Sequence, residues 1–166
     1  MNTIQTPIHQ ARRGESRPPQ AALEASPAKV PERLNQTIVT RDQLRLDVRA
    51  TERASFTEYH LTGTVLGAMD AGVAAEELLA QVAAVVAERG IQPIQEKLYG
   101  LSTVRAEVLR RREAQYRRQE LDLSVQVTWI VGTPLQGCGF AGVQIWGIVP
   151  RAAGVGVKTV ENPVTG

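Results

Sequence analysis

The stretch Phe56–Arg89, FTEYHLTGTVLGAMDAGVAAEELLAQVAAVVAER, decides the fold because its periodicity changes once along its length. Residues 56–65 alternate with a period of two, which predicts a half-buried strand. Residues 73–89 switch to the helical period, and a basic residue followed by Gly90 suits the end of a helix. The apolar stripe of this predicted helix consists of Leu78, Leu79, Val82, Val85 and Val86.

Further strands and a second helix are predicted on both sides of this stretch. The alternating segment Thr37–Arg49, entered through a turn at residues 41–42, is expected to pair with the 56–65 strand. A strand at Ile91–Leu101, a helix at Ser102–Glu120 capped by Ser102, and strands at Leu121–Val131 and Ala141–Val149 follow. This order predicts an α+β fold with two helices packed on one face of a mixed sheet. The alternating apolar positions suggest that another subunit covers the other face.

The two ends of the chain have a different composition. Residues 1–36 hold five of the nine prolines without apolar periodicity, which predicts a disordered, Pro/Arg-rich tail. The pair Arg12-Arg13 leaves a transit or docking peptide as the alternative interpretation. Residues 151–166 are also expected to be loosely held, so the predicted domain spans residues 37–150.

Composition limits the function classes. The 166 residues suit one domain, and no apolar run approaches the roughly 18 residues of a membrane helix. One cysteine and two histidines do not favour a disulfide framework or a metal cluster, and we expect no metal or cofactor. A formal charge of +2 does not favour nucleic acid. The chain is therefore expected to be a soluble, cytoplasmic protein.

An ordered series of short motifs resembles the Rid/YjgF family of reactive-intermediate deaminases and its chorismatase-like relatives, from about residue 44 to residue 149. The motifs are Thr62-Gly63-Thr64, Asp70 with Gly72, Gln81, Ala87-Glu88-Arg89-Gly90, Gly132-Thr133-Pro134 and Val143–Ile148. The resemblance implies a homotrimer whose sheets form an inner barrel, with ligand clefts between subunits.

The departures from that family concern its catalytic groups. The arginine that holds the substrate carboxylate would fall near Val125, where no cation stands. The glutamate that activates water corresponds to Gln144, and an amide exchanges no proton near neutral pH. The family's early Gly-Pro-Tyr-Ser motif is also missing, so the standard imine-deaminase mechanism is not expected.

The predicted cleft residues leave several alternatives open. Trp129 and Trp146 can stack on a planar ligand or pack in the core, and Gln126 and Gln144 can bind a ligand or pair with each other. Cys138, in a Gly-Cys-Gly turn without an activating partner, is read as an ordinary loop cysteine. The expected cleft set is Thr64, Tyr99, Gln126, Thr128, Trp129, Cys138, Gln144 and Trp146, and the expected anion-binding candidates are Arg105 and Arg151.

His60 and the arginine-rich helix each allow a structural and a functional interpretation. His60 is either a lone acid/base or, as we favour, an ordinary surface histidine. The arginine-rich helix at 102–120 either binds RNA phosphates or, as we favour, is a solvated face with pairs such as Glu113–Arg117.

Three hypotheses follow for function. The first is a divergent trimer that binds a small planar metabolite or a partner protein in its clefts. The second is a deaminase or chorismatase-like hydrolase with relocated catalytic residues. The third is an accessory or cargo subunit that docks to a larger assembly through its N-terminal tail.

Overall fold

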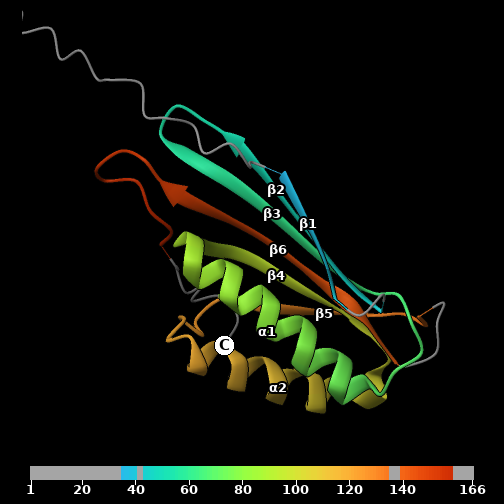
Figure 1. Ribbon diagram of the computed structural model, residues 1–166. Coiled ribbons are helices and arrows are strands. Elements are labelled where there is room, and N and C mark those ends of the chain that lie inside the picture. The colour runs from blue at the N-terminus through green and yellow to red at the C-terminus, as the bar shows by residue number, and fades with distance from the viewer. Residues whose placement is uncertain (1–34, 41–42, 135–138, 159–166) are drawn as a thin grey trace, which may run out of the picture. The chain divides into compact units, whose positions relative to one another are not determined.

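The structure, a computed structural model, describes residues 35–40, 43–134 and 139–158. Within these ranges the chain forms six strands, two α-helices and one 3-10 turn, η1 (Figure 1). In chain order these are β1 (Asn35–Thr40), β2 (Leu44–Glu52), β3 (Phe56–Val65), α1 (Ala71–Arg89), β4 (Gln92–Gly100), η1 (Ser102–Val104), α2 (Arg105–Arg118), β5 (Val127–Val131) and β6 (Phe140–Pro150). The predicted alternation of strands and helices is confirmed, with one strand more than the sequence predicted.

The six strands form one mixed sheet in the order β1-β2-β3-β6-β4-β5. Neighbouring strands run antiparallel except β4 and β5, which are parallel. Because a parallel pair needs a long crossover, α2 lies on the connection between these two strands. Both helices lie on one face of the sheet (Figure 1). The predicted α+β class, with two helices on one face of a mixed sheet, is confirmed.

The predicted strand at 37–49 is in fact a hairpin. β1 and β2 pair antiparallel, from Asn35 opposite Arg49 to Thr40 opposite Leu44. The predicted disordered tail therefore ends two residues too late, since β1 begins at Asn35; the residues before it lie outside the described ranges. Beyond β6, residues 151–158 form neither helix nor strand, and 159–166 lie outside the described ranges.

Two other boundaries were predicted wrongly. Ser102 does not cap the second helix: the residue before η1 is Leu101, which makes no side-chain cap bond, and α2 follows η1 directly. The strand predicted at 121–131 begins only at Val127, because Asp122 forms a local turn. Its carboxylate accepts bonds from the backbone N–H (2.8 Å) and hydroxyl (2.6 Å) of Ser124, and such local bonds compete with strand pairing.

The ends of α1 are fixed by its caps. Asp70 Oδ1 accepts hydrogen bonds from the backbone N–H groups of Gly72 (2.9 Å) and Val73 (3.1 Å). At the other end Gly90 adopts the left-handed conformation with φ 62°, as the sequence predicted for this C-cap. The helix begins two residues earlier than predicted, at Ala71, because Asp70 is the capping side chain.

The core lies between α1 and the centre of the sheet. The fully buried side chains of the predicted stripe pack with those of β2, β3 and β6. Gly63 permits this contact: a Cβ there would lie 2.8 Å from Val143 Cγ1 and 2.9 Å from Leu78 Cδ1. The glycine of the Thr62-Gly63-Thr64 motif is thus required where the helix approaches the sheet most closely.

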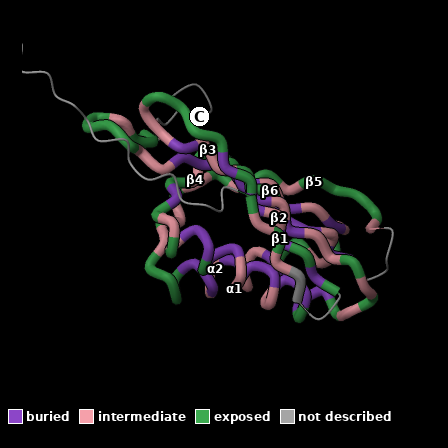
Figure 2. The backbone as a smooth tube through the Cα atoms, turned by 45° about the horizontal axis from the view of Figure 1, so that its top comes forward, coloured by how far each residue is buried: buried purple, intermediate pink, exposed green. Residues whose placement is uncertain are grey.

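The two faces of the sheet differ in polarity. Leu44, Leu46 and Val48 of β2 are buried and belong to the same core cluster as the apolar face of α1. Figure 2 shows buried stretches along both the helices and the strands. Because these apolar positions lie under the helices, they are already covered, and the packing of another subunit on the second face stays a prediction. We call that second face the helix-free face; among its side chains are Arg45, Asp47, Arg49, Glu58, His60, Thr62, Thr64, Gln95, Lys97, Tyr99, Thr128, Ile130, Gln144 and Trp146.

A buried ion pair joins α2 to the sheet, and its Arg112 is an exception to the solvated, salt-bridged face that the sequence predicted for this helix. Arg112 Nε donates to Glu96 Oε2 over 2.8 Å, and Nη2 lies 2.7 Å from the same oxygen. The Arg112 guanidinium lies 4.4 Å from the centre of the Tyr116 ring. Burial raises the pKa of Tyr116 well above its usual value, so its hydroxyl stays neutral.

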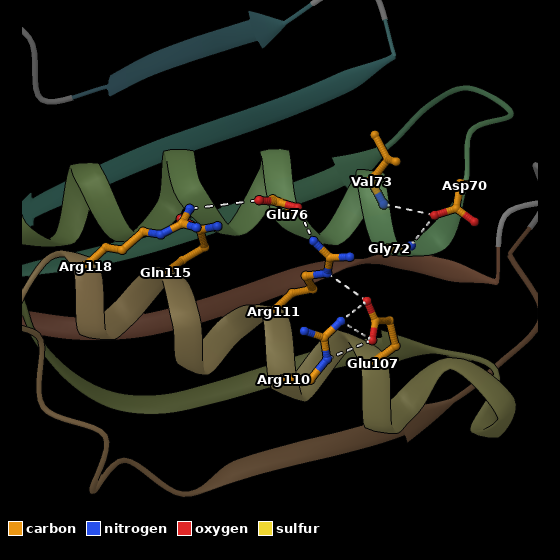
Figure 3. A network of polar contacts seen from close by, with 9 residues as sticks. All are labelled: Asp70, Gly72, Val73, Glu76, Glu107, Arg110, Arg111, Gln115 and Arg118. Atoms are coloured by element: carbon orange, nitrogen blue, oxygen red, sulfur yellow. Dashed lines mark hydrogen bonds and ion pairs between the residues drawn. The ribbon is translucent and has the colours of Figure 1, made fainter.

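Arg110, Arg111 and Arg118 of α2 form a network of charges with acids of the helix layer (Figure 3). Arg111 contacts Glu76 of α1 and donates to Glu107 over 2.7 Å, and Arg110 reaches the same Glu107 at 2.6 Å. The predicted Glu113–Arg117 pair is confirmed at 2.6 Å. The acids on this layer thus neutralise much of its positive charge. No helix in the described ranges is long and apolar enough to span a membrane.

Candidate functional site

A pocket of about 260 Å³ lies on the helix-free face, across the three central strands β3, β6 and β4. Its volume is close to that of small-metabolite sites. Most of its lining residues have their side chains on the helix-free face, whereas Leu61 and Ile145 belong to the core. It is lined by His60, Leu61, Thr62, Gln95, Lys97, Gln144, Ile145 and Trp146.

Strand register brings these residues together. His60 of β3 lies opposite Trp146 of β6, which in turn lies opposite Gln95 of β4. Two residues along, Thr62 lies opposite Gln144, which lies opposite Lys97. Because directly paired residues share a face, two rungs of three side chains form the walls of the pocket.

Glu58 is a hub of hydrogen bonds beside the pocket. Its Oε1 faces the Nε2 of His60 at 3.1 Å and accepts the indole N–H of Trp146 at 3.0 Å. Its Oε2 accepts the Nε and Nη2 of Arg53 at 3.1 and 2.9 Å. The bonds from Arg53 and then His60 lower the pKa of Glu58, so it is an ionised acceptor at neutral pH.

This hub holds two rings in a fixed arrangement. The rings of His60 and Trp146 are nearly parallel, with an interplanar angle of 9° and a centroid distance of 6.4 Å. The Trp146 side chain stays 39% exposed. Two parallel rings that are both exposed favour a flat ligand.

Gln144 presents its amide donors because its carbonyl is engaged. The hydroxyl of Tyr99 donates to Gln144 Oε1 over 2.6 Å, and burial raises the pKa of Tyr99, which keeps this donor protonated. The amide orientation follows from this bond, and the Nε2 group remains available as a donor. The site therefore offers a hydrogen bond to a ligand oxygen.

Lys97 supplies the positive charge of the pocket. In the ranges that the structure describes, no carboxylate lies within ion-pair distance of its ammonium group. A cation without a partner, next to an amide donor, is suited to a carboxylate or another small anion.

Only part of the cleft set predicted from sequence reaches this pocket. Gln144 and Trp146 line it, and Tyr99 contacts it through Gln144. Thr64 and Thr128 share the helix-free face, in register with Arg45 and Lys97. Cys138 lies outside the described residues.

Trp129 lies on the opposite face of the sheet from Trp146. It is paired with the buried Leu98 and packs against the core, and its indole N–H is buried. The strands β5 and β6 are also not adjacent, since β4 lies between them. The two tryptophans therefore cannot stack on one ligand, and the core interpretation holds for Trp129.

The remaining predicted residues lie away from the pocket. Gln126 is exposed before β5 and does not pair with Gln144, which bonds Tyr99. Arg105 is exposed at the start of α2, and Arg151 forms an ion pair with Glu52 at 3.2 Å. Neither Arg105 nor Arg151 lines the pocket of this chain, and their role as anion-binding residues between subunits stays a prediction.

Four polar residues at the pocket were missed by the sequence reasoning: Glu58, Thr62, Gln95 and Lys97. A signal did exist, since Gln95, Lys97 and Tyr99 alternate on one side of β4. Likewise Glu58 and His60 alternate on β3. The missing information was which of the two sides of each strand faces the helices.

Comparisons with known proteins give little further information. No family profile and no curated protein sequence matches this chain. One similar solved structure is described as a "putative translation initiation inhibitor" from Salmonella typhimurium. The two chains are 12% identical with a TM-score of 0.42, over 69% of this chain and 97% of that one. A likeness of this degree does not establish a shared family.

Within the described ranges, no group of three or more His, Cys, Asp or Glu side chains is placed to hold a metal ion. The side chains that line the pocket include one cation, one oriented amide, one histidine and one exposed indole ring.

Proposed function

We propose that this protein binds a small, planar, carboxylate-bearing metabolite in the pocket on its helix-free face. The observation that carries the proposal is the meeting of Lys97, Gln144 and the parallel His60 and Trp146 rings in one pocket. The lysine would hold the carboxylate, the amide would donate to a second oxygen, and the exposed indole would stack on the flat part of the ligand.

The test uses benzoate as the probe and the two indole N–H signals of the ¹⁵N-labelled protein as reporters. Benzoate should shift the Trp146 signal in a saturable way. Trp129 lies on the other face with its N–H buried, so its signal is an internal control. Benzamide, which has the same shape without the charge, should bind more weakly. Equal affinity for the two probes, or an unmoved Trp146 signal, would contradict the proposal.

A matched pair of variants tests the cation. Lys97→Gln should weaken benzoate binding about tenfold, since a charge-assisted hydrogen bond contributes about 1.5–3 kcal/mol. Arg105→Gln removes an exposed cation from α2, away from the pocket, and should leave the affinity unchanged. If the two variants had the same effect, the probe would be responding to net charge alone.

The homotrimer that the resemblance implies is a separate part of the proposal. It is supported by two exposed apolar side chains on the helix-free face, Trp146 at 39% and Ile130 at 36%. Copies that meet on this face would place the pocket next to a subunit boundary and enclose it further. Light scattering measures this directly, and a monomer at working concentration would contradict it.

A further inference from the structure

His60 lines the pocket, and its Nε2 lies 3.1 Å from Glu58 Oε1. We propose that His60 is a general base, and that the pocket catalyses keto–enol tautomerisation of a bound 2-oxo acid with a C–H bond beside its carbonyl. The inference rests on the proposed function, because the same pocket must first bind the acid through its carboxylate.

The orientation of the base follows from Glu58. This carboxylate is ionised and accepts from four donor atoms, two on Arg53, one on Trp146 and one on His60. In the neutral form of His60 this acceptor favours the tautomer with the proton on Nε2, which leaves the lone pair on Nδ1. Glu58 is thus a positioning residue that sets the tautomer of the histidine.

The other side of the pocket is arranged to stabilise negative charge on oxygen. Because the Tyr99 hydroxyl occupies Gln144 Oε1, the Gln144 amide can direct an N–H toward a carbonyl oxygen of the ligand. Lys97, directly opposite Gln144 in the sheet register, would hold the neighbouring carboxylate. A base on β3 and two donors on β6 and β4 therefore flank one planar ligand.

The step conserves atoms and electrons without a co-reactant. The C3–H bond of the 2-oxo acid breaks and its proton moves to His60 Nδ1. The electron pair of that bond forms the C2=C3 double bond, while the carbonyl π pair moves onto oxygen, where Gln144 donates a hydrogen bond. A solvent proton completes the enol, and the imidazolium returns its proton to solvent. The reverse sequence converts the enol to the keto form.

The experiment follows exchange of the C3 hydrogens of phenylpyruvate with D₂O by proton NMR, in the presence of the full chain. The rate should exceed that of buffer and saturate with phenylpyruvate. His60→Gln should lower the accelerated rate about 100-fold or more, as expected for loss of a general base. The other histidine of the chain provides the control, so His9→Gln should exchange at the original rate.

Glu58→Gln tests the positioning role. It should lower turnover with little change in the phenylpyruvate concentration at half-saturation. It should also change the ¹⁵N shifts of the His60 ring from a single Nε2–H tautomer to a mixture, which a merely structural role of Glu58 would not do.

The Trp146 indole signal reports binding, and the exchange rate reports catalysis, so the two proposals can fail separately. If phenylpyruvate moves the Trp146 indole signal while the exchange rate stays at the buffer value, the proposed binding function stands and the catalytic inference is overturned. The same holds if His60→Gln exchanges as fast as the unaltered protein. If the Trp146 signal does not move, both proposals are overturned.

Discussion

The buried Arg112–Glu96 pair allows one prediction to be worked through from the structure. Both guanidinium contacts reach the same carboxylate oxygen, Oε2, at 2.8 and 2.7 Å. The second oxygen, Oε1, is buried and has no hydrogen-bond partner among the described residues. The side chains are only 7% and 0% exposed, so neither charge is hydrated. The hydrogen bonds of the pair therefore offset only part of the free energy that it costs to remove both charges from water.

Breaking the pair should be far more costly than replacing it. Arg112→Met keeps an apolar chain of similar length but leaves the Glu96 carboxylate buried and alone, which should lower the free energy of unfolding by about 3–5 kcal/mol. Adding Glu96→Leu to the Arg112→Met variant removes the buried carboxylate that has lost its partner. The double variant should then recover to the stability of the original protein or exceed it, by up to about 4 kcal/mol.

The assay is urea unfolding followed by circular dichroism, with the free energy taken by linear extrapolation. Arg117→Met, which removes the exposed partner of Glu113, is the matched control and should cost no more than about 0.5 kcal/mol. A loss below 1 kcal/mol for Arg112→Met would refute the reasoning. So would a double variant that is no more stable than the single one, because the cost would then come from packing.

Three further predictions concern packing, pH and assembly. Gly63→Ala should lower stability by about 1–3 kcal/mol, because its Cβ would overlap Val143, whereas Gly132→Ala, with open space around it, should be near neutral in the same urea assay. Bonds from Arg110 and Arg111 lower the pKa of Glu107 below its usual 4.5, so its contribution is present above pH 4.5 and lost as pH falls through the folded-state value; Glu107→Gln should flatten this part of a stability–pH curve. Removing residues 1–34 should leave the light-scattering mass at three copies of the shortened chain, and a change in the number of copies would assign assembly to the tail.

Much of the architecture could be predicted from local pattern. The change from a period of two to a helical period fixed the β3–α1 unit, and the stripe from Leu78 to Val86 is the buried face of the helix. Gly90 ends α1 as predicted, because its left-handed conformation is a local requirement. The α+β class followed from the order of the elements, since an amphipathic helix and a half-apolar strand each need a partner layer.

The errors arose where one residue has to be placed against another far away in sequence. Alternation shows that Trp129 and Trp146 each lie on a particular side of a strand, but only the pairing of both β5 and β6 with β4 decides that those sides are opposite. The same limitation hid Arg112, whose position on α2 looks solvated until Glu96 of β4 is found beneath it.

The sequence by itself determined the element types, the cap of α1 and the class of fold, because these depend on local propensity and periodicity. The tertiary structure alone decided which residues form the pocket. His60, Gln95, Lys97 and Gln144 come from three strands separated by long stretches of chain, and strand register brings them together. Register depends on the packing of α1 and α2 against one face of the sheet, and a shift of one residue would turn every one of these side chains toward the core.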